Sequence, residues 1–199
     1  LFVKLTPFDV MFVPLLRKAF PAVPWIFLSR DPVEVMVSVH RKPFSISLSR
    51  EREAFAAGIS VSELAQRSPM EVFAHTIGNF CDAAARAAGT GGAFLDYADL
   101  SPDSMFAILS HFGVRPGADE LMAAGEAFKL HAKDLLRQAP WIPDTDQKQR
   151  EATAEIREGA ERFAGPPYQR VRLMARTPGF SLPDRKILER TSPPGMEFS

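Results

Sequence analysis

The clearest hydrophobic pattern in the chain is a short apolar run at residues 25–29, which Arg30 and Asp31 follow directly. A continuous apolar run of this length is typical of a strand that is buried on both faces. Asp31 and Pro32 are residue types that favour the N-cap and the first position of a helix. The pattern therefore predicts a strand, a cationic corner at Arg30 and a helix that continues to about residue 41.

A second strand and a helix are predicted before this segment. Residues 1–5 read as a short strand, and apolar residues at helical spacing over residues 10–20 predict a helix that ends at Phe20. With the strand at 25–29 they predict a βαβ unit with parallel strands. That topology would bring Lys4 and Arg30 to the same edge of the sheet.

Capping signals predict the next elements. Ser68, Pro69 and Glu71 form a capping box with proline at the first helical position, which predicts a helix to about residue 88. Residues 93–96 read as a strand, and Ser101 begins another helix that stops at a glycine.

The C-terminal third is predicted to be mostly helical. Residues 118–138 read as one or two helices, and residues 144–164 as a charged, solvent-facing helix that Pro166 and Pro167 end. From residue 176 onward, proline and polar residues predict an extended Pro-rich tail.

Composition limits the functional classes. The 199 residues suit one α/β domain over residues 1–175, and 24 basic against 24 acidic residues give no net charge that would favour nucleic acid. No apolar run reaches the length of a membrane span, and the start lacks signal-peptide features, so we expect a soluble, cytoplasmic chain. Because the sequence begins without Met inside a predicted strand, we also expect it to be the C-terminal part of a longer product.

Three residues of the helix at 69–88 have types that can carry chemistry. Cys81 lies in an apolar helical pattern and is predicted to be buried packing. His75 and Asn79 lie four residues apart with no third ligand nearby, so we interpret His75 as a histidine at the edge of the core.

The cationic corner is the main candidate site. Arg30 follows a strand and precedes a helix start, where an anion can be held, and Ser38 lies eight residues later on the same helix. The competing interpretation is that Arg30 forms only an ion pair at a capped helix.

Arg30-Asp31-Pro32 with Ser38 resembles the 3′-phosphate-binding segment of the sulfotransferases that use 3′-phosphoadenosine 5′-phosphosulfate (PAPS). Two more segments fit that family in order. The first has Lys4 after a strand and a helix that ends in Phe-Pro, and the second has FLDYADL at residues 94–100, a capped helix and HFGV.

The resemblance implies a P-loop NTPase-like, three-layer α/β fold with a parallel sheet flanked by helices, incomplete at the N-terminus. It implies that Arg30 and Ser38 hold the 3′-phosphate of PAPS, that Tyr97 lies near the nucleotide, and that Lys4 contacts the transferred sulfuryl group as the catalytic cation. PAPS would be the sulfuryl donor, no metal would be needed, and the acceptor would be an unidentified hydroxyl or amine. Tyr97 as a buried structural tyrosine and Lys4 as a solvated lysine are the alternatives.

The chain also departs from the family. Thr6 stands where many members have a histidine base, and no Arg-Lys-Gly motif follows the helix at 118–138. The loop that binds the 5′-phosphosulfate would lie upstream, so we expect this chain alone to catalyse poorly. A non-catalytic sulfotransferase-like module for nucleotide or partner binding is therefore the alternative function.

Overall fold

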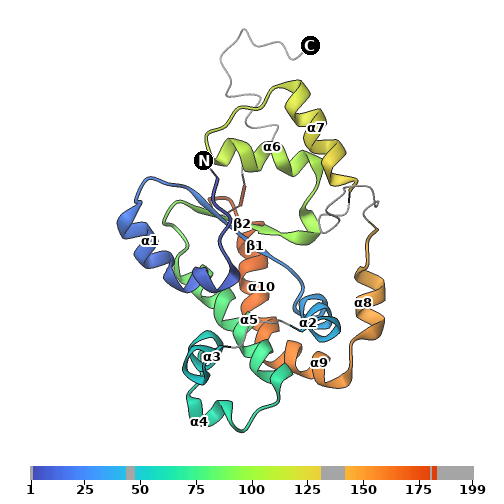
Figure 1. Ribbon diagram of the computed structural model, residues 1–199. Helices are drawn as coiled ribbons and strands as arrows, with labels where there is room; N and C mark the ends of the chain where they lie inside the picture. The colour runs from blue at the N-terminus through green and yellow to red at the C-terminus, as the bar shows by residue number, and fades with distance from the viewer. Residues whose placement is uncertain (1, 44–47, 131–141, 180, 183–199) are drawn as a thin grey trace.

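The computed structural model describes residues 2–43, 48–130, 142–179 and 181–182. It is a mixed α/β structure in which helices predominate around a small sheet (Figure 1). Strands β1 (Trp25–Ser29) and β2 (Gly92–Asp96) pair in parallel, with Trp25 opposite Gly92 and Ser29 opposite Asp96. The predicted strands at 25–29 and 93–96 are confirmed, but the expectation that the first is buried on both faces is wrong: within β1 only Ser29 is buried, and Leu28 is 48% exposed.

The helical segments follow one another along the whole described chain. In order they are a 3₁₀ turn at Pro7–Phe12, α1 (Val13–Ala19), α2 (Pro32–Arg41), α3 (Arg50–Ala57), α4 (Val61–Leu64), α5 (Pro69–Arg86), a 3₁₀ turn at Tyr97–Asp99, α6 (Pro102–His111), α7 (Ala118–Phe128), α8 (Thr145–Glu151), α9 (Ala154–Gly159), a π-helical turn at Ala160–Ala164 and α10 (Gly165–Met174).

The predicted caps of the main helices are confirmed. The Asp31 carboxylate accepts a hydrogen bond from the backbone N–H of Glu34 at 3.2 Å and so caps α2. Ser68 and Ser101 cap α5 and α6 in the same way. Each cap satisfies a backbone donor that the first turn of a helix leaves without a partner, which is why these helices begin where the sequence predicts.

Helix α5 lies at the centre of the core. It packs against α10, α3 and the π-helical turn, and its buried side chains Cys81 and Ala84 share an apolar cluster with Phe94 of β2 and Val171 of α10. A Cβ atom at Gly78 of α5 would lie 2.4 Å from the carbonyl oxygen of Phe163, so only glycine permits this close packing.

The segment expected as the first strand is not a strand. Residues 2–5 are extended without pairing, and the described part of β1 pairs only with β2. Phe2 instead packs edge-on against Phe112 with 5.2 Å between ring centroids. A strand needs a partner for its backbone N–H and C=O groups, and this segment has none among the described residues. The predicted βαβ unit is therefore wrong here, and Lys4 does not follow a strand.

The prediction of one solvent-facing helix over residues 144–164 is also wrong. Ala152 is extended and separates α8 from α9, while α9, the π-helical turn and α10 continue through Pro166 and Pro167. The prolines occupy the first turn of α10, where a missing backbone N–H costs little. Ile156 is fully buried, so this region contributes to the core.

The predicted tail begins against the sheet. Ser181 forms an isolated parallel bridge with Phe94 of β2, and the guanidinium of Arg176 lies 3.8 Å from the carboxylate of Asp99. The expected tail beyond residue 182, and the predicted helix at residues 131–138, lie outside the described residues.

Candidate functional site

Arg30 and Tyr97 meet where the two paired strands end. Ser29 and Asp96 are the last paired residues of β1 and β2, so Arg30 and Tyr97 both follow the carboxyl ends of adjacent parallel strands. The Arg30 guanidinium lies over the Tyr97 ring, 4.3 Å from its centroid. This contact is a cation–π interaction, and it fixes the plane of the guanidinium.

Arg30 is also held by carboxylates. Its Nε and Nη2 atoms donate to one carboxylate oxygen of Glu34, at 2.9 and 2.5 Å, and Nη2 lies 3.4 Å from Asp144. The side chain of Glu34 is only 9% exposed. Within the described residues, Nη1 of Arg30 has no partner. The ion pair that the sequence offered as the competing interpretation is thus present, and it leaves one end of the guanidinium available.

Ser38 lies on the second turn of α2, as predicted, and its hydroxyl faces back along the helix. The hydroxyl donates to the backbone carbonyl of Glu34 at 2.8 Å. Ser38 and Arg30 therefore both contact Glu34, one through its backbone and the other through its side chain. A serine hydroxyl rotates about one bond, so the same group can turn toward another acceptor.

Lys4 is not brought to this cluster. It is exposed in the extended segment before the 3₁₀ turn at Pro7–Phe12, and no contact joins it to Arg30 or Tyr97 in the described part of the chain. Of the residues predicted for the site, the structure places Arg30 against Tyr97. Ser38 lies on α2, the helix that begins just after Arg30, and Lys4 lies apart from them.

Asp144 and Glu34 are the acidic residues at this site that sequence analysis missed. Asp144 lies at the start of α8 and faces three cations: Lys148 at 2.9 Å, Arg30 at 3.4 Å and Arg41 at 3.9 Å. Burial tends to raise the pKa of Asp144, but the hydrogen bond from Lys148 and the charges of the three cations outweigh burial and lower it. Arg41 also pairs with Glu151 at 2.7 Å.

The two missed residues, Glu34 and Asp144, differ in whether the sequence contains a signal for them. Glu34 lies four residues after Arg30 on a helix, and this spacing is a known signal for an ion pair. Asp144 is more than a hundred residues from Arg30 in the chain, and no local pattern links them. Only the tertiary structure brings α8 to α2.

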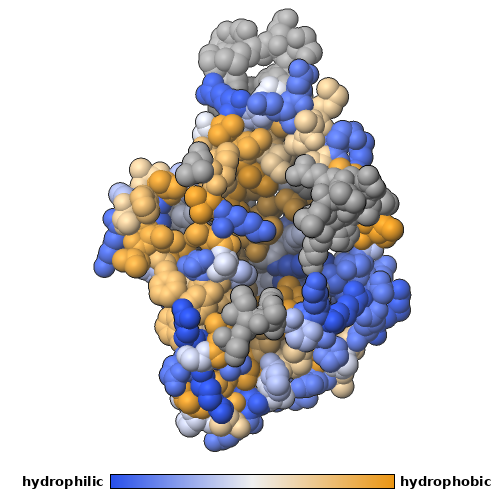
Figure 2. All heavy atoms as spheres, in the orientation of Figure 1, coloured by the Kyte–Doolittle hydropathy of each residue, from blue (hydrophilic) through white to orange (hydrophobic). Residues whose placement is uncertain are grey.

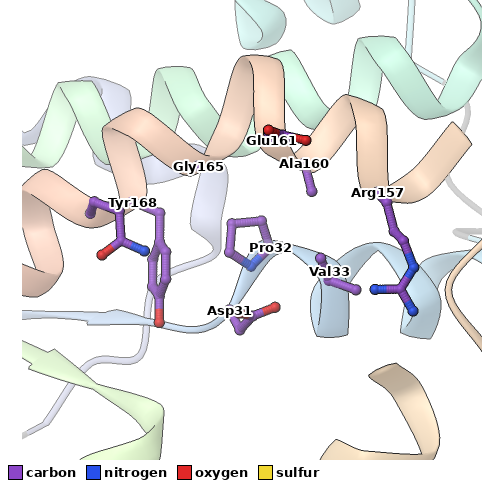
Figure 3. A pocket seen from close by; sticks show the side chains of 9 residues that line it. Asp31, Pro32, Val33, Arg157, Ala160, Glu161, Gly165 and Tyr168 are labelled. Carbon is purple, nitrogen blue, oxygen red and sulfur yellow. The ribbon is translucent and has the colours of Figure 1, made fainter. Parts of the chain in front are cut away.

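A pocket of about 340 Å³ opens beside the start of α2. Asp31, Pro32 and Val33 line it from α2, and Figure 3 shows Arg157 and Tyr168 on the opposite side, from α9 and α10. The charged side chains that line the pocket are one cation, Arg157, and two carboxylates, Asp31 and Glu161, so its lining does not favour an anion.

The Tyr168 hydroxyl donates to the Asp96 carboxylate at 2.7 Å. Burial, and then the hydrogen bond to Asp96, raise the pKa of Tyr168. This pair ties α10 to the end of β2, next to Tyr97.

The other candidates from the sequence have structural roles. The His75 ring stacks on Phe163 at 4.0 Å, and the Asn79 amide donates to the carbonyl of Ala56 at 3.0 Å. Burial raises the pKa of Cys81 to about 12, so its thiol stays protonated. The interpretations of His75 as a core-edge histidine and of Cys81 as buried packing are confirmed.

Two further observations concern metals and membranes. In the described part of the chain, no three or more His, Cys, Asp or Glu side chains come together as metal ligands. None of the described helices combines the length and apolar character needed to cross a membrane.

The chain was compared with protein-family models, with curated proteins and with solved structures. None of the three comparisons gave a match.

Proposed function

We propose that this chain is a PAPS-dependent sulfotransferase domain with a P-loop NTPase-like fold. In this proposal Arg30 and Ser38 bind the 3′-phosphate of the nucleotide, and Tyr97 lies beside it. Lys4 contacts the sulfuryl group as it moves from PAPS to a hydroxyl or amine acceptor, where a cation stabilises the charge of the transition state.

One observation carries the proposal: Arg30 lies over Tyr97 at the joined carboxyl ends of β1 and β2, next to the start of α2. In open α/β sheets, ligands bind outside the carboxyl ends of the strands, and a helix start favours an anion. Tyr97 and Glu34 hold the guanidinium in place while Nη1 stays without a partner among the described residues. Phosphate recognition by arginine uses guanidinium N–H groups that are held in a fixed plane and can donate to phosphate oxygens.

Binding requires a small change at Ser38. Its hydroxyl donates to the Glu34 carbonyl, and it must rotate to donate to a phosphate oxygen. The exchange replaces a neutral hydrogen bond with a charge-assisted one, which is stronger.

The test is thermal unfolding with adenosine 3′,5′-bisphosphate and, as a control ligand, 5′-AMP. At about a hundred times its dissociation constant, the bisphosphate should add about 2.7 kcal/mol to the free energy of unfolding. This gain should disappear in a double variant, Arg30→Ala with Ser38→Ala. The control variant is Arg162→Ala, which removes an arginine from a similar but exposed pair with Glu158.

The second candidate function is a non-catalytic module. The observation that favours it is that Arg30 already joins α2 to α8 through Asp144. If the Arg30 variant loses stability while neither ligand shifts the wild-type unfolding temperature, the module explains the chain and the sulfotransferase proposal is contradicted.

A further inference from the structure

Three cations converge on one carboxylate next to the proposed phosphate site. Lys148, Arg30 and Arg41 all lie within 4 Å of Asp144, the first two at 2.9 and 3.4 Å. The Lys148 side chain is 6% exposed, and Asp144 is its only ion-pair partner within the described residues. Burying an ammonium group is costly unless an anion lies against it, so this place in the fold requires a negative charge.

The Asp144 carboxylate, which supplies this charge, is held more loosely against Arg30 than the Glu34 carboxylate is. Asp144 is 40% exposed and lies on a different segment from Arg30, at 3.4 Å. Glu34, in contrast, is 9% exposed, lies only four residues from Arg30 in the chain and accepts two hydrogen bonds from it. An anion that arrives at Arg30 will therefore displace Asp144 before it displaces Glu34.

We propose that Asp144 occupies, in the free protein, part of the position of the 3′-phosphate of the nucleotide, against Nη2 of Arg30. When the phosphate binds, Asp144 leaves, the phosphate bonds to both Nη1 and Nη2 of Arg30, and Arg41 and Lys148 join as its ligands. This inference rests on the proposed function and adds two residues and a competing internal anion to its phosphate site. It also offers a substitute for the Arg-Lys-Gly motif that the chain lacks.

An internal competitor lowers the apparent affinity. The measured dissociation constant equals the intrinsic one divided by the fraction of molecules whose site is open. If Asp144 fills the site in about nine molecules of ten, removing its charge should tighten binding about tenfold.

The variant to test is Asp144→Asn, which keeps the size of the side chain and removes the charge. Its matched control is Glu151→Gln, because Glu151 lies at the other end of α8 and pairs with Arg41, while no ion pair among the described residues joins it to Arg30 or Lys148. Calorimetric titration with adenosine 3′,5′-bisphosphate should show binding about tenfold tighter for Asp144→Asn and less than about threefold changed for Glu151→Gln. Binding of 5′-AMP should be the same in all three proteins.

The outcomes separate the two proposals. Tighter binding in Asp144→Asn alone, including binding that the wild type does not show, supports the inference. Equal binding of the bisphosphate by wild type and Asp144→Asn overturns the inference and leaves the proposed function intact. Absence of binding in both proteins overturns both.

A second pair of variants covers the case in which Asp144→Asn does not fold. Arg41→Gln and Lys148→Met should each weaken binding of the bisphosphate about tenfold while 5′-AMP binding stays unchanged. Far-ultraviolet circular dichroism checks that each protein is folded. If both folded variants bind the bisphosphate as the wild type does, Arg41 and Lys148 are not phosphate ligands and the inference is wrong.

Discussion

Helices α5 and α10 contact each other through buried apolar side chains, whereas α2 and α8 contact each other through ion pairs. Cys81 and Ala84 of α5 pack with Val171 of α10 in one cluster. Between α2 and α8, Arg41 pairs with Glu151, and Asp144, just before α8, pairs with Arg30. On the face of the molecule seen in Figure 2, the side chains over α8 are mostly polar, whereas those over α1 are mostly apolar.

The difference indicates which contact can respond to a ligand. Apolar burial is non-directional, depends on close packing and changes little with salt. Ion pairs near the surface are weak and screened, and an incoming anion competes with them directly. The α5–α10 contact therefore holds the fold, while the α2–α8 contact can rearrange when a phosphate binds.

Gly78→Ala should have the largest effect on stability, because it disturbs the close packing of α5. The new Cβ atom would lie 2.4 Å from the Phe163 carbonyl oxygen, and backbone atoms cannot move aside cheaply. We expect a loss of about 3 kcal/mol in the free energy of unfolding, measured by urea denaturation. The control is Gly125→Ala in α7. A Cβ atom there would meet no described atom within 4 Å outside its own stretch of helix, so a gain of up to about 1 kcal/mol is expected. Equal effects at the two glycines would show that close packing does not hold α5.

Tyr168→Phe should cost about 2 kcal/mol, because it removes one hydrogen bond from a buried carboxylate. Asp96 is 1% exposed and accepts from the Tyr168 hydroxyl at 2.7 Å. Tyr97→Phe is the control, since the Tyr97 hydroxyl has no hydrogen bond among the described residues and the ring under Arg30 is kept. Chemical denaturation of both variants measures the difference; a similar loss from each would contradict the role given to the Tyr168–Asp96 pair.

A pair of double-mutant cycles should sharpen the ionic side of the comparison. The pairs Arg30–Glu34 and Arg162–Glu158 both join residues four apart in the sequence, but the side chain of Glu34 is 9% exposed and that of Glu158 is 67% exposed. We expect a coupling energy of about 1.5 kcal/mol for the first pair, where the hydrogen bonds join charged groups. The second pair should give about 0.3 kcal/mol. Equal coupling energies would mean that burial does not strengthen the Arg30–Glu34 pair.

The smallest effect should appear as a pH dependence of stability where His75 of α5 stacks on Phe163 of the π-helical turn. Burial, followed by the charge of Arg67, lowers the pKa of His75. The unfolded chain then binds the proton more readily than the folded one, so stability is complete above about pH 6.5 and falls as the pH drops toward the lowered pKa.

His75→Phe keeps a ring against Phe163 and removes this proton. Urea unfolding of wild type and variant at several pH values between about 5 and 8 measures the difference. The wild type should lose stability relative to the variant as the pH falls below about 6.5. A difference that stays constant with pH would exclude His75 as the cause.

Local signals predicted the parts of the fold that depend on local interactions. Asp31, Ser68 and Ser101 cap helices because their side chains bond to backbone N–H groups three residues later, and the sequence shows both partners. The strand at 25–29 was likewise predicted from its own apolar run.

The incorrect predictions concern pairing partners and long-range contacts. The extended segment at residues 2–5 has a strand-like composition but no pairing partner in the described structure. The charged pattern of α8 did not reveal that Lys148 is buried, because α8 packs against the distant helix α2, although the counterion of Lys148, Asp144, lies only four residues away. For the same reason the sequence located Arg30 just before α2 and Ser38 on it, but it gave no indication of Asp144.

The parallel register of β1 and β2 has a consequence for how the chain folds. Trp25 pairs with Gly92, so the two strands are separated by more than sixty residues, which include α2, α3, α4 and α5. This long loop must close before the first backbone hydrogen bond of the sheet can form. The entropy of closing so long a loop must be offset by contacts that form earlier, and helices form from local contacts far faster than distant strands meet. We therefore expect the sheet to form late, after α5 has collapsed against its neighbours. The corner that holds Arg30 and Tyr97 would then be among the last parts of the molecule to become ordered.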